Sequence, residues 1–276
     1  ILLQKSAMSK RREFMARGAS AVIGFSGLSI SARRASAEQS VGAADIGIAE
    51  QVRELFQSGK GAEAIALLNE HDVYHQSTQE IRGANDGGSI GTEDNWSKNQ
   101  SSVSFAGYKL TGDFYEASLG YDISGEQHDY YEYAYPKDAI RLSWKPDQFT
   151  YESGSLNYSF NYRNKQDIIN GGTGITVAND PLTDTPSSGI GIKVDDNYSD
   201  NSTDGFYGSA AFQATKTESS EGWLAGDYTH TWTFGVASGG LTFTAGGPIG
   251  IGIKLPTGDS DKWELPKANE DKIANL

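Results

Sequence analysis

The chain has 276 residues, 33 of them glycine and 11% aromatic, and its formal net charge is −13. This length suits one all-β domain, alone or with a small helical attachment, and the aromatic content argues against disorder throughout. The acidity disfavours nucleic acid and anionic lipid as partners, and the lack of cysteine excludes disulfides, thiolate metal sites and cysteine nucleophiles.

The segment 1–37 has the organisation of an export signal. A basic region comes first, and the apolar stretch 18–30 that follows is too short to span a bilayer as a stable helix. The defining residues are a twin-arginine motif and a small-x-small cleavage site, formed by Arg11, Arg12, Phe14, Ala35 and Ala37. We therefore expect a twin-arginine signal peptide, contact with the twin-arginine translocase during export, and a secreted, extracellular product.

Processing changes the boundaries and the charge of the chain. Met8 lies directly ahead of the motif, so we expect the natural start there, with residues 1–7 upstream of it. The segment through Ala37 carries seven basic residues and one acidic residue, so its removal takes the formal charge from −13 to −19. Such acidity suits very high salt, where screening removes self-repulsion. We favour a halophilic origin over the ordinary acidity of secreted proteins.

Apolar residues follow a helical period between residues 44 and 71. Two stripes are formed by Ile48, Val52, Leu55 and Phe56 and by Ala64, Ile65 and Leu68. Gly59 lies between the stripes and is a suitable helix-ending residue. We predict a helical hairpin over 38–75 and a polar linker over 76–100.

After residue 100 the apolar period becomes two. Alternating runs occur at 115–123, 131–135, 140–144, 156–162, 228–236 and 249–255. Turns rich in glycine, aspartate, asparagine and serine separate these runs, and no alternation of strands with helices is present. The pattern predicts a mainly β fold, in which an antiparallel β-sandwich or barrel-like domain over 101–276 follows the short helical hairpin.

One acidic stretch resembles the opening of a calcium loop. Asp200, Ser202 and Asp204 supply alternate oxygen ligands, and Gly205 allows a sharp turn. The twelfth loop position, which needs a glutamate, is occupied by Ala211. A hydrated acidic turn is therefore favoured, with a structural calcium ion as the alternative. No other cofactor is expected.

Two further patterns bear on histidine. His71 and His75 are four residues apart, which would place both on one helix face, where they could chelate a metal ion. Because they lie at the predicted helix end without a third ligand, a polar helix terminus is favoured. His230 lies on an aromatic strand face, and we expect a packed or hydrogen-bonded core residue.

Five N-x-S/T sequons are candidate glycan acceptors in an exported protein, at Asn95, Asn99, Asn157, Asn197 and Asn201. We expect one or two of them to be used. The tyrosine-rich stretch 130–135 could form a sugar-stacking platform, although core packing of one face is favoured. The stretch 239–253 alternates apolar with small residues, and a hairpin packed across a sheet is favoured over a membrane-inserting one.

The export motif, the acidic β-rich remainder and the segment 55–64 resemble the twin-arginine-exported secreted proteins of haloarchaea. The resemblance implies export but assigns no catalytic residue, and whether the chain is an enzyme stays open, with a non-enzyme favoured. We expect a non-enzymatic extracellular or cell-surface-associated protein that binds glycan or envelope components. The alternative is a secreted, halocin-like antimicrobial protein that acts on competitor membranes, and the third hypothesis is an extracellular hydrolase.

Overall fold

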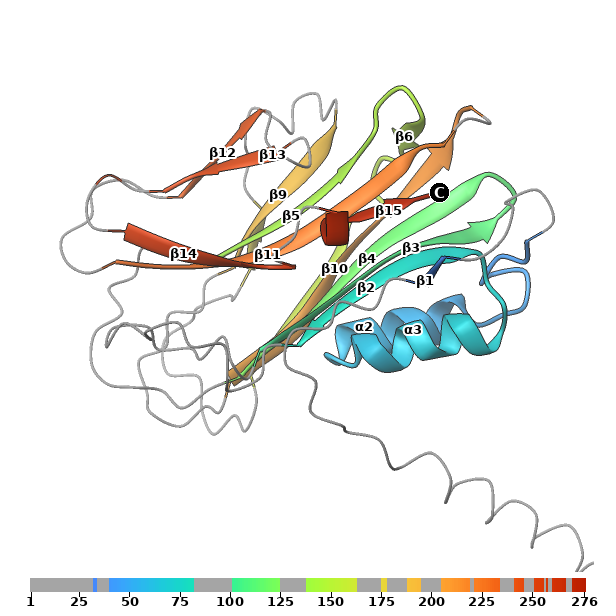
Figure 1. The fold of residues 1–276 in the computed structure, drawn as a ribbon, viewed down its shortest axis with the longest axis horizontal. Helices are drawn as coiled ribbons and strands as arrows, with labels where there is room; N and C mark the ends of the chain where they lie inside the picture. Colours follow the sequence, from blue (N-terminus) through green and yellow to red (C-terminus); the bar gives the residue numbers. More distant parts are fainter. Residues whose placement is uncertain are drawn as a thin grey trace, which may run out of the picture.

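The computed structural model describes residues 32–33, 40–81, 101–124, 138–162, 175–177, 188–194, 205–218, 221–233, 241–245, 251–255, 257, 260–266 and 270–276. These residues form two antiparallel sheets that face each other, and two short helices cover the outer face of one sheet (Figure 1). The predicted fold is confirmed: the protein is mainly β, with an antiparallel, sandwich-like arrangement preceded by a helical hairpin.

Sheet 1 carries the helices. Its order is β1-β2-β3-β4-β10-β6, and β7 also pairs with β10. The strands are β1 (Ala32–Arg33), β2 (His75–Ile81), β3 (Ser102–Thr111), β4 (Phe114–Ser124), β6 (Phe149–Tyr151), β7 (Asn157–Tyr162) and β10 (Gly205–Lys216). Since β4 occupies one side of β10, strands β6 and β7 share the other side, one after the other.

Sheet 2 has the order β14-β11-β5-β9-β8, with β15 also paired to β11. Its strands are β5 (Asp138–Trp144), β8 (Ile175–Val177), β9 (Gly189–Val194), β11 (Trp223–Thr233), β14 (Ser260–Leu265) and β15 (Ile273–Asn275). The short helix η3 (Glu270–Lys272) leads into β15. A separate two-stranded hairpin of β12 (Thr242–Ala245) and β13 (Ile251–Lys254) packs on the outer face of sheet 2.

The main core lies between the two sheets. In β4, the inward positions Tyr115, Leu119 and Ile123 are at most 3% exposed, as the period of two requires. Aromatic rings fill the space, and those of Trp144 and Tyr151 stack with centroids 5.4 Å apart. Burial of so many large apolar side chains, each contributing about 1.5–3 kcal/mol, stabilises a chain without disulfides.

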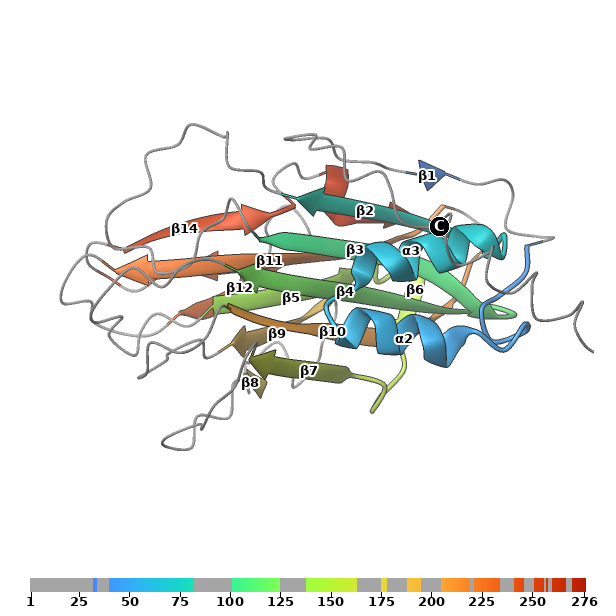
Figure 2. The same cartoon turned by 90° about the horizontal axis from the view of Figure 1, so that it is seen from below.

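The helices α2 (Ala49–Gln57) and α3 (Gly61–Glu70) lie on the opposite face of sheet 1 (Figure 2). Val52, Phe56 and Leu68 from the predicted stripes are at most 1% exposed and pack on this face. A Cβ atom at Gly120 of β4 would lie only 2.9 Å from Cδ1 of Phe56, so this glycine allows α2 to approach the strand closely. The predicted hairpin of two short helices is confirmed.

Two boundaries in the predicted hairpin and linker are wrong. Helix α3 ends at Glu70, and His75 begins β2, so His71 and His75 do not share a helix face. Residues 76–81, predicted as the start of the linker 76–100, instead continue β2 and pair with β3. The sequence of β2 is polar, but Ser77 and Thr78 are each only 2% exposed because the strand is covered on both faces.

The hairpin β12–β13 forms a fourth layer. Leu241, Phe243 and Ile251 are at most 5% exposed and cluster with Ala139 of β5. A Cβ atom at Gly191 of β9 would lie 2.5 Å from Cδ2 of Phe243, so the glycine leaves the space that this ring fills. The predicted packing of this stretch across a sheet is confirmed for the part that the structure describes.

Candidate functional site

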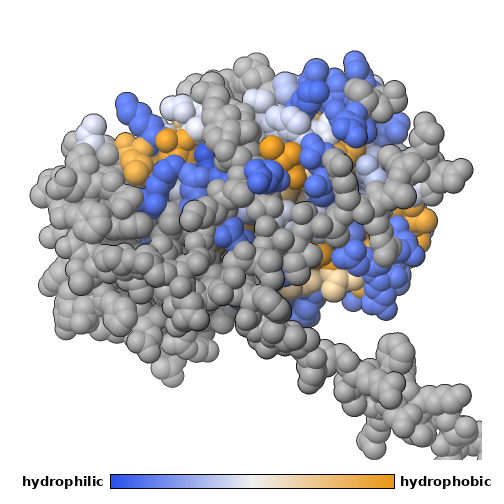
Figure 3. Space-filling view, viewed as in Figure 1, coloured by the Kyte–Doolittle hydropathy of each residue, from blue (hydrophilic) through white to orange (hydrophobic). Residues whose placement is uncertain are grey.

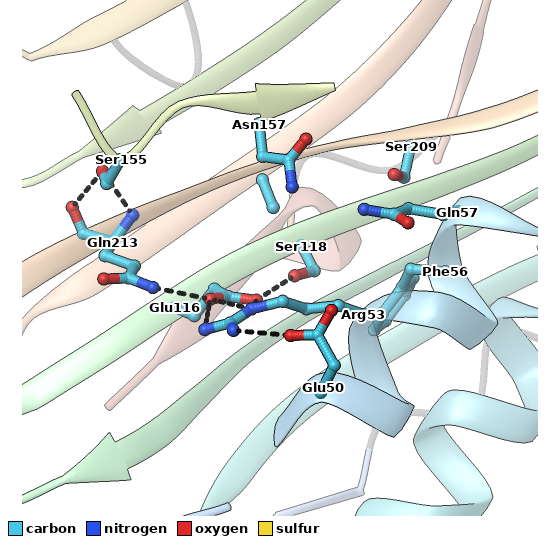
Figure 4. A pocket seen from close by; sticks show the side chains of 11 residues that line it. Glu50, Arg53, Phe56, Gln57, Glu116, Ser118, Ser155, Asn157, Ser209 and Gln213 are labelled. Atoms are coloured by element: carbon cyan, nitrogen blue, oxygen red, sulfur yellow. Dashed lines mark hydrogen bonds and ion pairs between the residues drawn. The ribbon is translucent and has the colours of Figure 1, made fainter. Parts of the chain in front are cut away.

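A pocket of about 170 Å³ opens on the outer face of sheet 1, between α2 and the start of β7 (Figure 4). It is lined by Glu50, Arg53, Phe56, Gln57, Glu116, Ser118, Ser155, Asn157, Ser209, Ala211 and Gln213. Sites for drug-sized ligands occupy roughly 300–1,000 Å³, so this pocket suits one small group or one unit of a larger polymer. Its lining is mostly polar.

The floor of the pocket comes from the outward positions of two paired strands. Glu116 of β4 lies opposite Gln213 of β10, and Ser118 lies opposite Ala211. Successive residues of a strand point to opposite faces of the sheet. The neighbouring residues of β4 and β10 fill the sandwich core, so these small or polar side chains lie on the outer face. Small side chains at the centre of the floor leave the hollow, and larger ones, Glu116 and Gln213, border it.

The walls come from α2 and from the chain between β6 and β7. On β10, β6 pairs with residues 214–216 and β7 with residues 206–211, so Gln213 lies between the two ladders, where its carbonyl accepts the Glu152 N–H at 3.0 Å. Ser155 fills the interruption, since its Oγ accepts the N–H of Gln213 at 3.0 Å and contacts its carbonyl oxygen at 3.4 Å. The detour of the chain at this point forms the wall opposite α2.

Glu116 is the centre of the hydrogen-bond network and is 2% exposed. Its carboxylate accepts from Nη2 and Nε of Arg53 at 2.7 and 2.9 Å, from Ser118 Oγ at 3.1 Å and from Gln213 Nε2 at 3.2 Å. The Tyr108 hydroxyl donates to the same carboxylate. Four side chains from α2, β3, β4 and β10 therefore converge on one buried charge.

Electrostatics within the network follow from this geometry. The hydrogen bond to Glu116 raises the pKa of Arg53; burial opposes this shift, and the negative charge of Glu116 adds to it. Burial, together with the charge of Glu116, also raises the pKa of Tyr108 well above its usual value. Both groups are therefore locked in their protonated forms, and the network is a fixed donor set around a carboxylate.

A saturated carboxylate of this kind is a poor general base. An ionised carboxylate has about four acceptor positions, and the donors on Glu116 occupy them. The role of Glu116 is to hold Arg53 and Gln213 in place. The third hypothesis, an extracellular hydrolase, gains no support from this residue.

Other groups at the pocket remain open to a ligand. The side-chain amides of Gln57 and Asn157 have no hydrogen-bond partner among the described residues, and both reach into the space between α2 and β7 (Figure 4). Glu50 is 74% exposed, and among the described residues its carboxylate pairs only with Nη1 of Arg53, at 3.3 Å. The open groups are thus two amides and one carboxylate, arranged on two walls.

The described residues also contain two buried polar clusters away from this pocket. On sheet 2, Asp227 accepts from Arg141 Nε at 2.7 Å and from Lys272 Nζ at 2.9 Å, while Glu264 contacts both cations. Burial would raise the pKa of Glu264, but hydrogen bonds from Lys262 and Lys272 and the charge of Arg141 outweigh it and lower the pKa to about 2. This cluster also fixes the hairpin β12–β13, since Arg141 Nη1 donates to the Ile251 carbonyl.

The second cluster is centred on Asp138, inside the sandwich. Its carboxylate accepts from His230 Nδ1 at 3.0 Å, from the Thr231 N–H at 2.9 Å and from the Tyr228 hydroxyl. His230 is fully buried. The prediction that His230 is a hydrogen-bonded core residue is confirmed.

Most residues singled out in the sequence lie outside the described part of the chain. These are the signal and cleavage residues Arg11, Arg12, Phe14, Ala35 and Ala37, the calcium-loop residues Asp200, Ser202 and Asp204, the sequons at Asn95, Asn99, Asn197 and Asn201, and the tyrosines at 130–135. Asn157 is the one sequon asparagine that the structure describes, and it lies at the rim of the pocket. Among the described residues, no cluster of three or more histidine or acidic side chains could hold a metal ion.

The charged residues of the pocket were missed in the sequence, whereas Phe56 and Asn157 were singled out for other reasons. In the sequence, Arg53 and Glu50 fit the solvent-exposed face of an amphipathic helix. Glu116 fits an outward position of a strand. Glu116 itself could have indicated a polar site. It is a charged residue inside an alternating apolar run, and if the outer face of its strand is covered, its charge needs a partner there. The partner, however, is far away in the chain.

Comparisons with known proteins identify no family. No family model and no curated protein matches the chain. The C-terminal domain of the Streptococcus agalactiae AgI/II polypeptide BspA is 8% identical, with a TM-score of 0.24; the match covers 46% of this chain and 53%, about half, of that one. A structure described as a pore forming protein is 10% identical, with a TM-score of 0.29, over 68% of this chain and 90% of that one.

Two features of the described residues bear on membrane contact. No helix among the described residues is both long and apolar enough to cross a bilayer. On the face shown in Figure 3, the described residues are mainly hydrophilic, with apolar side chains in small separate groups.

Proposed function

We propose that this protein binds glycan through the pocket between α2 and β7, as a non-enzymatic extracellular or cell-surface-associated protein. The observation that carries the proposal is the pair of side-chain amides of Gln57 and Asn157, on opposite walls of a polar pocket, for which the described residues supply no hydrogen-bond partner. The extracellular location is supported by the twin-arginine motif in the sequence.

The chemistry of the open groups suits hydroxyl-rich ligands. A side-chain amide donates and accepts, as a sugar hydroxyl does, so each of Gln57 and Asn157 can form paired hydrogen bonds with neighbouring hydroxyls. The amides cost little to leave open in the free protein because water solvates them at the rim. The fixed network under them, centred on Glu116, keeps the pocket formed in the absence of ligand, which lowers the ordering cost of binding.

The size of the pocket sets the unit that is recognised. A volume of about 170 Å³ admits a single sugar ring, and the open side allows a polymer to continue beyond it. The affinity for one unit is therefore expected to be low, in the millimolar range of about −4 kcal/mol. Many copies of the unit on a cell surface would supply the avidity for stable attachment.

The test is a binding assay on purified, unglycosylated protein, so that no glycan on Asn157 covers the pocket. Retention on columns of immobilised neutral polysaccharide is measured for the wild type, Asn157→Ala and Gln57→Ala. We expect each variant to lose roughly 2- to 10-fold in affinity, as the loss of one hydrogen bond implies.

Matched controls are available for both variants. Asn161→Ala removes an exposed asparagine from the same face of β7, and Gln51→Ala removes an exposed glutamine from α2, and neither residue lines the pocket. Both controls should bind as the wild type does. Absence of binding to every polysaccharide, or equal losses in Asn157→Ala and Asn161→Ala, would refute the proposal. Release of sugars from the column would favour the hydrolase hypothesis instead.

A further inference from the structure

We infer that the pocket selects neutral and amine-bearing sugars and rejects acidic sugars. This inference rests on the proposed glycan binding at the same site and adds a class of ligand to it. It follows from which charged groups of the pocket are already committed to each other and which are open.

Among the described residues that line the pocket, the one cation is already paired with carboxylates. The charged lining residues are Glu50, Arg53 and Glu116, which amount to one guanidinium and two carboxylates. Nε and Nη2 of Arg53 bind Glu116 at 2.9 and 2.7 Å, and Nη1 faces Glu50. A carboxylate of a uronic acid could reach Nη1 only in competition with Glu50. A two-pronged contact would require Arg53 to abandon the nearly buried Glu116, which is costly because that charge would lose its partner.

The open charge is negative and lies at the rim. Glu50 is 74% exposed, and its only ion pair within the described residues, at 3.3 Å, is of the surface type that contributes about 0–1 kcal/mol. The carboxylate can therefore turn toward a ligand at little cost. It accepts from a hydroxyl, and it accepts more strongly from an ammonium group, where donor and acceptor are both charged.

The field of the whole chain acts in the same direction. The formal charge is −13, so a negatively charged ligand approaches against repulsion and a positively charged one is attracted. Local and global charge thus favour the same order of ligands: amine-bearing, then neutral, then acidic.

Three sugars that share one ring test this order. Binding of glucosamine, glucose and glucuronate is measured by NMR titration of the whole protein at about pH 6, where an amine with a pKa near 8 is protonated. We expect glucosamine to bind about 2- to 5-fold more tightly than glucose, and glucuronate to bind most weakly. Raising the salt from about 0.05 M to about 0.5 M should shrink both differences through screening.

A matched pair of variants assigns the effect to the pocket. Glu50→Gln and Glu54→Gln remove the same charge from exposed positions of α2, but only Glu50 lines the pocket. Glu50→Gln should abolish the preference for glucosamine over glucose, whereas Glu54→Gln should retain the preference.

The outcomes separate this inference from the function on which it rests. Equal binding of the three sugars, tightest binding of glucuronate, or an equal effect of the two variants overturns the selectivity while glycan binding stands. Failure of all three sugars and of the polysaccharide columns overturns glycan binding itself.

Discussion

Arg53 and Glu116 are 63 positions apart in the chain, yet Nη2 of Arg53 lies 2.7 Å from a carboxylate oxygen of Glu116. This contact joins helix α2 to the middle of sheet 1. It neutralises a charge that is almost completely buried and sets the position of the helix above the pocket floor. The same pair thus serves the fold and the candidate site.

Arg53→Ala should destabilise the protein by about 3 kcal/mol, because it leaves the Glu116 carboxylate buried without its cation. Urea unfolding followed by circular dichroism measures the change. Glu50→Ala is the control and should cost less than about 1 kcal/mol, since Glu50 is largely exposed. A loss in Arg53→Ala no greater than in the control would show that the contact does not hold α2.

Glu264 should make the stability depend on pH in the acidic range. Its pKa in the folded protein is about 2, below its usual value of 4.5, so the unfolded chain binds the proton more tightly. The contribution of Glu264 is therefore complete above about pH 5 and is lost as the pH falls toward 2.

The measurement for Glu264 is the difference in unfolding free energy between the wild type and Glu264→Gln at several pH values. The difference should be largest near neutral pH and should shrink as the pH falls through this window. Comparing the two proteins cancels the contribution of the other acidic residues. A difference that stays constant with pH would contradict the prediction.

Gly191→Ala should loosen the hairpin β12–β13, because the new Cβ atom would lie 2.5 Å from the Phe243 ring. Overpacking of this kind costs about 1–3 kcal/mol. Limited proteolysis and urea unfolding report the two consequences. Adding Phe243→Leu relieves the clash, so the double variant should lose less stability than the sum of the single losses. Strict additivity would show that the two residues do not compete for the same space.

Asp138→Ala should cost about 3 kcal/mol or more, because it leaves His230, Tyr228 and the Thr231 N–H without their shared acceptor inside the core. Tyr228→Phe removes only one donor and should cost about 1 kcal/mol. Thermal unfolding distinguishes the two. The prediction fails if the two variants are equally stable.

Elements with a clear apolar period were predictable from the sequence. The alternating run at 115–123 corresponds to β4, Phe114–Ser124, and the helical stripes correspond to α2 and α3. In these segments one face is more buried than the other, so apolar residues recur with the period of the strand or helix and predict its type.

The strand β2 could not be recognised in the same way. Its sequence, His-Gln-Ser-Thr-Gln-Glu-Ile, is polar, and nothing in it alternates. The strand forms because β3 supplies its hydrogen bonds and because the helices cover Ser77 from outside the sandwich. Strand pairing and helix cover both depend on the fold and not on the residues of β2 itself, so the local sequence pattern does not record them.

The pocket was hidden for a related reason. Glu116 and Gln213 each look like ordinary outward residues of a half-exposed strand, and only the pairing of β4 with β10 places them opposite each other. Asn157 was singled out as a sequon, but its position at a rim depends on where the chain re-enters the sheet.

The interruption between β6 and β7 lies at the boundary between a surface turn, which can change in sequence, and the strands of the core, which cannot change without loss of packing. The turn that spans 152–156 is tied to β10 through Ser155 and Gln213, while the strands beneath it belong to the sandwich core. Residues inserted into that turn would change the width and chemistry of one wall and leave β4, β10 and the Arg53–Glu116 contact where they are. The fold is thus suited to diversification of the pocket, because the turn at 152–156 can change while the floor formed by β4 and β10 stays the same.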